Sequence, residues 1–314
     1  FQFLVGNLEY LGLRLDVAYN LVSILSMLGL QMMLYKLAER MMGGFAVGIL
    51  SCVLFFFRSG WTFFRYLWEH WKLGDLWQTL ASNTTFIGYT ENENWGLWCF
   101  NVYLNQRHLA FGMLIVSLML WMFLDWLEAG DSREETGISW IKGRLLSKEA
   151  WCSKDLGRAL FAGTLLGLTS FWNGAAVIGG LLILAGFALF SDHKLVYLAF
   201  AVVTILFSIL QVRLLMNSSA AVFSFYWGLL AADKTPAGVL WYLFQISGFF
   251  FLGLVALCFY LSRLQRMALL GFSIPLFFAF TISLTPDIAV NHKYVMISYA
   301  FLTIFWARTV KKIW

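Results

Sequence analysis

Two short basic runs stand where long apolar stretches begin, NQRH at 105–108 and NHK at 291–293. The N-terminus of a helix already carries positive partial charge, so cationic side chains are unfavourable there. An anion bound between these side chains and the unpaired backbone N–H groups of the first helical turn would offset the repulsion. Phosphate or pyrophosphate suits such a site, because a guanidinium group offers paired donors and an ammonium group a point charge. The alternative is that each run only reaches for lipid headgroups.

We therefore assign phosphate binding to the two basic runs together. The Asn at the head of each run is expected to cap its helix by accepting a backbone N–H bond. An acid shortly before the second run is expected to form an ion pair with the basic residues of that run. The phosphate-binding residues are Arg107, His108, His292 and Lys293, and the supporting residues are Asn105, Asn291, Tyr294 and Asp287.

A pair of acids, Glu91 and Glu93, lies a short distance before the first basic run in the segment YTENEN at 89–94. Two neighbouring carboxylates can hold a divalent cation through oxygen ligands, or one of them can act as a general base. The alternative is a solvated loop tip. We take Glu91 and Glu93 as candidate catalytic bases and assign no metal ligands.

Composition indicates an integral, multi-pass membrane protein. Hydrophobic residues make up 61% of the 314 residues, and only 12% are charged. Apolar stretches of bilayer-spanning length follow one another, which predicts an all-α, polytopic transmembrane helical protein in a single domain, 1–314. The basic residues are scattered among the spans, so nucleic acid is not an expected partner. Nine spans are predicted, at roughly 17–35, 44–58, 109–127, 158–172, 174–190, 195–212, 239–260, 267–284 and 294–310.

The distribution of positive charge predicts the orientation. Fourteen of the 22 lysines and arginines fall on the side of the polar loop 128–157, so that side and the C-terminus are expected to be cytoplasmic. Both basic runs then lie on the outer side, in a bacterial plasma membrane or an ER-type membrane. The outer loop 59–108 is rich in aromatic residues, and 61–78 is expected to form an amphipathic helix in the headgroup zone. The inner loop 128–157 is expected to be a solvated connector.

Three smaller features carry expectations of their own. The run FWNG at 171–174 predicts a tight outer hairpin between two short arms, and the glycines of these arms predict close helix packing. No two of the four cysteines share a loop, so neither a disulfide nor a zinc site is expected. His193, in an inner turn, is expected to be solvated. The glycines are Gly163, Gly167, Gly179, Gly180 and Gly186.

The chain resembles the GT-C class of polytopic membrane glycosyltransferases in three stretches. YNLVSILSMLGLQMMLYKLAERMMGG at 19–44 is similar to the second span of such enzymes, with a Tyr-x-Leu-x-x-Arg inner boundary and a Gly turn. GRALFAGTLLGLTSFWNGAAVIGGLLILAGFALFS at 157–191 is similar to their central hairpin. NHKY at 291–294 stands where these enzymes place groups that meet the lipid phosphate.

The resemblance implies an enzyme that moves a sugar from a polyprenyl-phosphate donor to an acceptor on the non-cytoplasmic side. It also implies a catalytic carboxylate in a first outer loop, which would lie upstream of Phe1 in a chain that is N-terminally incomplete. The expected partners are membrane lipids and the lipid-linked sugar. A divalent cation is the only cofactor considered, and none is assigned.

Two other functions stay open at this stage. A transporter or flippase of an anionic lipid or solute would carry ionisable residues within its spans, but Asp125 lies near an inner span end and Gln31, Gln211 and Gln245 are uncharged. A non-catalytic lipid-binding subunit would share the fold and lack the catalytic carboxylate.

Overall fold

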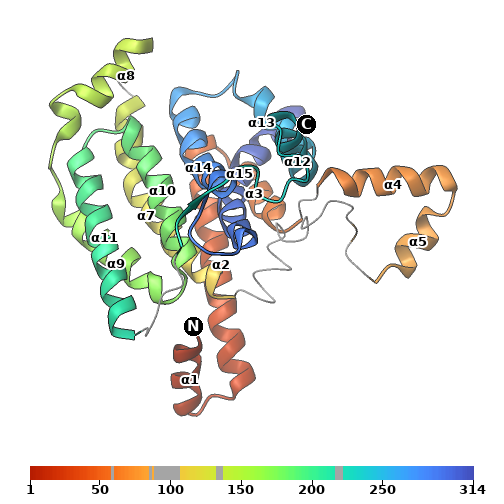
Figure 1. The fold of residues 1–314 in the computed structure, drawn as a ribbon, viewed down its shortest axis with the longest axis horizontal. Helices are drawn as coiled ribbons and strands as arrows, with labels where there is room; N and C mark the ends of the chain where they lie inside the picture. Colours follow the sequence, from red (N-terminus) through yellow and green to blue (C-terminus); the bar gives the residue numbers. More distant parts are fainter. Residues whose placement is uncertain (58–59, 85–86, 88–106, 132–136, 216–221) are drawn as a thin grey trace.

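The computed structural model describes residues 1–57, 60–84, 87, 107–131, 137–215 and 222–314. The described chain is all-α apart from two short strands, β1 (Ser224–Phe225) and β2 (Ile282–Ser283), which pair antiparallel. Figure 1 shows the helices gathered in one bundle from which α4 and α5 project. The helices are α1 (Gln2–Tyr10), α2 (Leu15–Met42), α3 (Phe45–Phe57), α4 (Trp61–Leu73), α5 (Leu76–Ser82), α7 (Arg107–Asp131), α8 (Gly137–Leu146), α9 (Leu156–Leu168), α10 (Gly174–Phe190), α11 (Lys194–Leu215), α12 (Pro236–Ser247), α13 (Phe249–Leu257), α14 (Arg263–Thr281) and α15 (His292–Ile313), with short 3-10 turns η3 (Glu149–Trp151), η4 (Thr169–Phe171) and η5 (Ile288–Asn291).

Five described helices are long and apolar enough to cross a membrane, namely α2, α7, α11, α14 and α15 with its η5 extension. Two bent pairs raise the number to seven if each pair is one span: α3 with α4, bent by 72°, and α12 with α13, bent by 111°. The remaining predicted spans correspond to the shorter apolar helices α9 and α10. Every predicted span therefore contains helix. The number of nine spans is not confirmed. The helices support an integral membrane protein that crosses the membrane several times.

The predicted span 239–260 is not one continuous helix. It breaks between α12 and α13 at Gly248, whose φ of +61° is open to glycine and strained for other residues. Thr235 caps α12 by accepting a bond from the Gly238 N–H at 3.1 Å, and Pro236 occupies the first helical position. Local sequence signals therefore define both the beginning and the end of α12. The hydropathy of 239–260 did not reveal this break.

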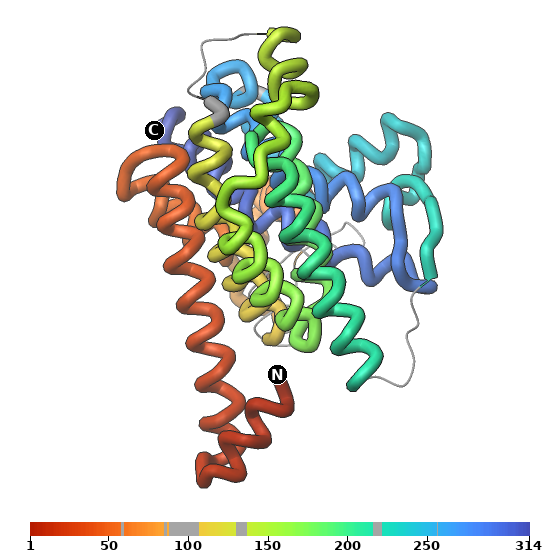
Figure 2. The backbone as a smooth tube through the Cα atoms, turned by 90° about the vertical axis from the view of Figure 1, so that its left-hand side faces the viewer, coloured from red at the N-terminus to blue at the C-terminus, as the bar shows by residue number. Residues whose placement is uncertain are grey.

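The helix α15 lies in the middle of the bundle and packs against α3, α10, α13 and α14 (Figures 1 and 2). Its side chains are buried around the whole circumference, including Met296, Ile297, Phe301 and Trp306. A helix that is apolar all round is typical of a bundle core. Since α15 begins at His292, the second basic run sits at one end of the core.

Glycines set the closest helix contacts, as the sequence predicted. A Cβ on Gly163 would lie 2.8 Å from the carbonyl oxygen of Phe200, and one on Gly167 would lie 2.8 Å from that of Thr204. These contacts join α9 to α11. On α10, Gly179, Gly180 and Gly186 face side chains or backbone of α15, α7 and α14 respectively. Small residues let helix backbones approach closely where lipid offers no hydrophobic driving force.

The predicted hairpin between the two short arms is confirmed as a turn between α9 and α10. The η4 turn ends α9, and the Asn173 side chain caps α10 by accepting the Ala176 N–H at 2.9 Å. Trp172 then packs on Phe111 of α7, with ring centroids 4.6 Å apart. The turn thus lies beside the N-terminal end of α7, where the first basic run begins.

The helix predicted over 61–78 is two helices, because Gly74 adopts a left-handed conformation (φ +75°) and ends α4. Trp61 fixes the start of α4 to the hinge between α12 and α13, with its ring 4.9 Å from that of Phe249. Trp68, Trp71 and Trp77 are exposed along α4 and α5. These exposed rings belong to the predicted aromatic outer loop 59–108, of which 59, 85–86 and 88–106 lie outside the described residues.

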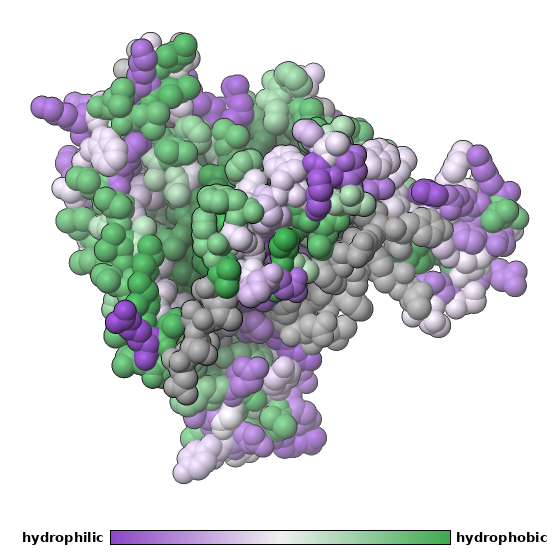
Figure 3. Space-filling view, viewed as in Figure 1, coloured by the Kyte–Doolittle hydropathy of each residue, from purple (hydrophilic) through white to green (hydrophobic). Residues whose placement is uncertain are grey.

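Hydropathy divides the surface in a way that fits a membrane (Figure 3). Hydrophobic residues cover much of the face over α9 and α11, hydrophilic residues are frequent at α1 and on the projecting α4 and α5, and α8 shows both kinds. Exposed apolar side chains, such as those of Leu198, Leu206 and Leu210, lie along α11. A surface of this kind is stable in lipid rather than in water.

The inner connector is more structured than predicted. Within it, α8 packs against α10 through Trp140, which stacks on Phe190 with ring centroids 6.2 Å apart. Arg144 is fully buried and its Nη1 lies 2.8 Å from Oδ1 of Asp192. A buried charge needs a partner of opposite sign. The expectation of a solvated connector is therefore wrong for α8, and the ion pair explains why.

Candidate anion site

Arg107 and His108 occupy the first turn of α7, and Arg107 is bonded to a neighbouring helix. Arg107 Nη1 donates to Oδ1 of Asn20 at 2.7 Å, and its guanidinium carbon lies 4.6 Å from the centre of the Tyr19 ring. Both partners belong to α2. Arg107 therefore holds α7 to α2, through a charged hydrogen bond and a cation–π contact.

His108 and Lys293 bring the two basic runs together. The ammonium group of Lys293 lies close enough to the His108 imidazole for a repulsive electrostatic interaction. The two residues are 185 positions apart in the sequence and stand at the N-terminal ends of α7 and α15. Both side chains are half-buried. In the described part of the chain, neither side chain has a hydrogen bond or an ion pair.

His292 is bonded to its own turn. Its Nδ1 donates to the carbonyl oxygen of Ala289 at 2.8 Å, which leaves Nε2 as the acceptor in the neutral ring. Asp287 accepts the Ala289 N–H at 2.9 Å and so caps η5. It acts on His292 electrostatically, but forms no ion pair with His292 or Lys293 among the described residues. The predicted ion pair of Asp287 is thus replaced by a backbone cap.

Asn291 is a structural residue, and its predicted capping role is wrong. It makes no side-chain cap for α15 and is 1% exposed. Its Nδ2 donates instead to the Tyr226 hydroxyl and to the Ile282 carbonyl oxygen, each at 2.6 Å. Burial raises the pKa of Tyr226 to about 12. These bonds fasten the 222–228 segment to the end of α14, where β1 and β2 pair.

Tyr294 also serves packing. It is 5% exposed, and its ring meets that of Phe278 edge-on with centroids 4.9 Å apart. The remaining predicted residues, Asn105, Glu91 and Glu93, lie outside the described residues. Across the part of the chain that is described, no group of three or more His, Cys, Asp or Glu is placed to hold a metal ion.

A cluster of aromatic rings, Phe1, Tyr19, Phe111 and Trp172, lies near the N-terminal end of α7. The sequence analysis did not assign this aromatic cluster to the site. Phe1 packs edge-on against Tyr19, at 5.1 Å between centroids, and against Trp172, at 6.4 Å. Trp172 in turn contacts Phe111, one helical turn beyond His108. We call this end of the bundle the basic rim, defined by Tyr19, Asn20, Arg107, His108, Trp172 and Lys293. In the sequence, the FWNG turn at 171–174 was the feature that could have indicated this aromatic cluster.

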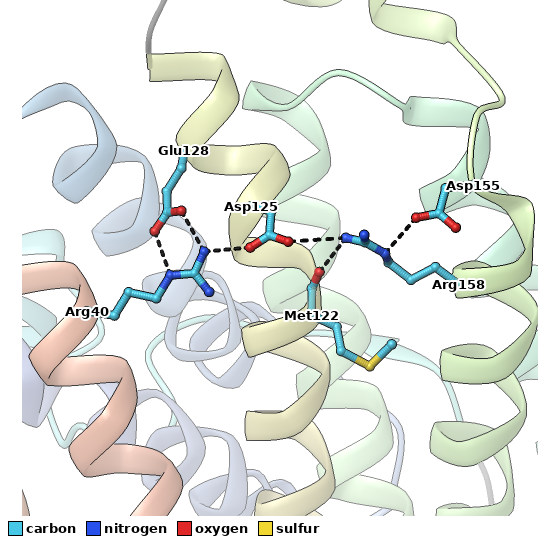
Figure 4. A network of polar contacts seen from close by, with 6 residues as sticks. All are labelled: Arg40, Met122, Asp125, Glu128, Asp155 and Arg158. Carbon is cyan, nitrogen blue, oxygen red and sulfur yellow. Dashed lines mark hydrogen bonds and ion pairs between the residues drawn. The ribbon is translucent and has the colours of Figure 1, made fainter.

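The opposite end of the bundle is held by a chain of ion pairs between α2, α7 and α9, which we call the clamp rim (Figure 4). Arg40 on α2 binds Glu128 at 2.6 Å and Asp125 at 2.5 Å, both on α7. Arg158 on α9 lies 3.7 Å from the other oxygen of Asp125 and 2.8 Å from Asp155. The predicted position of Asp125 near a helix end is confirmed, and its charge is shared between two arginines.

A comparison of the chain with protein-family models, with curated proteins and with solved structures found no match in any of the three.

Proposed function

We propose that this protein binds the phosphate of a polyprenyl-phosphate-linked sugar at the basic rim and acts there as a membrane glycosyltransferase. The observation that carries the proposal is that His108 and Lys293, at the ends of two helices distant in the sequence, lie within electrostatic range of each other, with no hydrogen bond or ion pair to either among the described residues. The resemblance of 19–44, 157–191 and 291–294 to GT-C enzymes supplies the chemistry of the donor.

The electrostatics of the rim favour an anion. Lys293 and the protonated form of His108 would repel each other, and each residue stands at a helix end that already carries positive partial charge. Half-burial makes this repulsion stronger than in water, because it is less screened. A phosphate group between Lys293 and His108 would remove the repulsion and also accept bonds from backbone N–H groups of the first turns.

The surroundings favour an anion that is joined to a lipid. Phe111 and Trp172 place aromatic rings next to the first turn of α7. The lateral surface of the bundle, which would face lipid, is apolar. A polyprenyl chain could lie in the membrane while its phosphate stays at the rim. During transfer, negative charge grows on the phosphate as the sugar leaves, and cations fixed beforehand stabilise that charge. The base that would deprotonate the acceptor is Glu91, Glu93 or a carboxylate upstream of Phe1.

We further propose that α9 and α10 cross the membrane as a hairpin, which gives nine passes in all. Arg158 near the start of α9 is bonded at the clamp rim, and Trp172 after α9 packs at the basic rim. The nine passes are then the five long helices, the two bent helix pairs, α9 and α10. Gln265 at the start of α14 donates to the Met41 carbonyl oxygen at 3.0 Å at the clamp end, whereas β1 pairs with β2 at the other end of α14. The chain must therefore traverse the bundle between β1 and α14.

Binding of farnesyl phosphate tests the site without knowledge of the sugar. The purified protein in detergent should bind farnesyl phosphate and not neutral farnesol. Lys293→Ala and His108→Ala should each weaken binding by about tenfold or more, since a hydrogen bond to a charged group contributes about 1.5–3 kcal/mol. Lys293→Arg should retain most of the affinity. Lys72→Ala, on exposed α4, is the matched control and should change nothing.

Sugar transfer from a panel of polyprenyl-phosphate sugars is the second measurement. Lys293→Ala should lower turnover sharply, with the same elution profile and thermal stability as the native protein. Equal turnover by Lys293→Ala, or equal binding of farnesyl phosphate and farnesol, would refute the proposal.

A transporter or flippase is the second candidate, because one observation favours it. The 111° break between α12 and α13 resembles the discontinuous helices from which transporters build binding sites. The Ser247 hydroxyl at the break is bonded to the Tyr299 hydroxyl, so the hinge is held to α15. Flux of farnesyl phosphate into proteoliposomes, with no sugar transfer, would favour this function. A non-catalytic lipid-binding subunit would bind the lipid and do neither.

A further inference from the structure

A cysteine and a histidine meet at the clamp rim, far from the candidate anion site. Sγ of Cys152 lies 3.5 Å from Nδ1 of His193, which is hydrogen-bonding distance for sulfur. The backbone N–H of Lys154 also donates to this sulfur, at 3.3 Å. Cys152 is partly exposed. The thiol of this partly exposed residue therefore faces a proton acceptor and also accepts a bond from a backbone N–H.

His193 is held firmly in this position, contrary to the expectation that it is solvated. Its ring stacks on Trp126 with centroids 4.6 Å apart and an angle of 21°. Its backbone adopts a left-handed conformation, φ +67°, between α10 and α11. Burial lowers the pKa of His193 below its usual value. The imidazole is therefore neutral at neutral pH and can accept a proton through Nδ1 when Nε2 carries the hydrogen.

The residues that adjoin this pair in the sequence line an apolar groove. It measures about 360 Å³ and lies on the surface between α10 and α11, within the size range of small-ligand sites. Its lining is almost wholly apolar, and it includes Trp151 and Lys194, the immediate neighbours of Cys152 and His193 in the sequence. Lys194 Nζ is already bonded to carbonyl oxygens at the end of α10, at 2.6 Å for Ala188 and 2.8 Å for Ser191. The groove therefore suits a hydrocarbon chain rather than an anionic headgroup.

We propose that Cys152 is a site of S-acylation, that His193 is the base that activates it, and that the attached long acyl chain lies in the groove between α10 and α11. The donor is a long-chain acyl thioester such as an acyl coenzyme A. A single juxtamembrane cysteine next to an apolar surface is a typical position for this modification. The proposal is independent of the sugar-transfer function, because the two sites lie on opposite rims.

The chemistry is a thioester exchange without net oxidation or reduction. His193 Nδ1 takes the proton of the Cys152 thiol, and the thiolate attacks the carbonyl carbon of the donor. A new carbon–sulfur bond forms at Cys152 while the carbon–sulfur bond of the donor breaks. The leaving thiolate takes the proton back from His193. One buried CH₂ contributes about 0.8 kcal/mol, so a long chain in the groove would hold the product in place.

The other described cysteines offer matched comparisons. Cys258 is exposed after α13, and within the described chain it has no histidine partner. Cys52 lies within α3 and bonds to the Gln31 carbonyl oxygen at 3.4 Å. If exposure alone decided reactivity, Cys258 would be acylated first. If the pair with His193 decides it, Cys152 is acylated first.

The test is incubation of the purified protein in detergent with palmitoyl coenzyme A, followed by mass spectrometry with and without neutral hydroxylamine. We expect a hydroxylamine-sensitive palmitoyl group on Cys152, lost in Cys152→Ser and unchanged in Cys258→Ser. His193→Asn should slow the reaction by about tenfold or more, because a positioned base contributes about 10²–10⁴-fold. Asparagine tolerates the left-handed conformation, so this variant preserves the turn.

A groove variant separates chain binding from thiol reactivity. Ala185 lines the groove on the exposed side of α10, so Ala185→Trp should fill it without disturbing the core. This variant should slow transfer from palmitoyl coenzyme A several-fold and leave transfer from acetyl coenzyme A unchanged. Equal labelling of Cys152 and Cys258, retained labelling in Cys152→Ser, or an unaltered rate in His193→Asn would overturn the proposal.

Discussion

At the scale of single residues, four basic side chains that look alike in the sequence do different work. Arg107 bonds to Asn20 and stacks on Tyr19, whereas His292 bonds to a carbonyl oxygen of its own turn. His108 and Lys293, on two different helices, lie within electrostatic range of each other. The candidate anion site is therefore narrower than the two basic runs, and variants of the four residues should separate into two groups.

Arg107→Ala should reduce stability more than it reduces farnesyl phosphate binding. It removes a charged hydrogen bond between α7 and α2, which contributes about 1.5–3 kcal/mol. Lys293→Ala should show the opposite pattern, because that side chain has no described partner to lose. Thermal unfolding in detergent and farnesyl phosphate titration, carried out on both variants, measure the two effects. Equal losses of binding in the two variants would mean that Arg107 also touches the phosphate.

At the scale of elements, the pair of α9 and α11 shows how the bundle is assembled. Gly163 and Gly167 bring α9 against the backbone of α11. Polar side chains of α11 then bond across the contact, with Gln211 accepting from the Phe171 N–H at 2.9 Å and Thr204 donating to the Gly163 carbonyl oxygen at 3.3 Å. Bonds of this kind join helices in lipid, where apolar contact alone gives little preference for one partner.

Gly167→Ala should destabilise the protein by about 1–3 kcal/mol, the usual cost of an added methyl group in a tight contact. The added Cβ would lie 2.8 Å from the Thr204 carbonyl oxygen. Gly157→Ala is the matched control in the same helix, because no atom lies within 4 Å of its Cβ position. It should be neutral or slightly stabilising, since alanine favours the helix. Thermal unfolding of both variants measures the difference, and equal melting temperatures would contradict the close contact.

At the scale of the whole molecule, the basic rim and the clamp rim mark the two ends of the helix bundle. Every basic residue of the candidate anion site lies at one rim, and the arginine–carboxylate chain of Figure 4 lies at the other. The excess of Lys and Arg on the side of the clamp rim predicts, as an expectation still to be tested, that this side is cytoplasmic. The proposed sugar transfer then takes place outside, and the proposed acylation takes place where acyl coenzyme A is found.

Sidedness is testable with single cysteines in a variant that lacks the native ones. Gly174→Cys and Lys154→Cys, at the two ends of α9, should react with a membrane-impermeant maleimide from opposite faces of sealed vesicles. Arg14→Cys and Lys312→Cys mark the two faces as references, since Arg14 precedes α2 and Lys312 lies at the end of α15. Reaction of Gly174→Cys and Lys154→Cys from the same face would show that α9 does not cross.

The sequence by itself indicated an apolar, helical, multi-pass protein and the positions of its long apolar helices. Long apolar runs can satisfy the hydrogen bonds of their backbone groups in lipid only as helices. Local signals such as FWNG at 171–174 predict a turn whatever the tertiary arrangement of the helices. The close-packed glycines were likewise visible, because small residues have a direct geometric effect.

Only the tertiary structure decided which residues meet. The spans are apolar on nearly every side, so no stripe in the sequence shows which face turns inward. Thus Asn291 could be read as a cap although it bonds to Tyr226, and His193 could be read as solvated although it stacks on Trp126 and faces Cys152. The approach of His108 to Lys293 depends on how α7, α10, α14 and α15 pack together, and packing is a property of the assembled bundle rather than of any one segment.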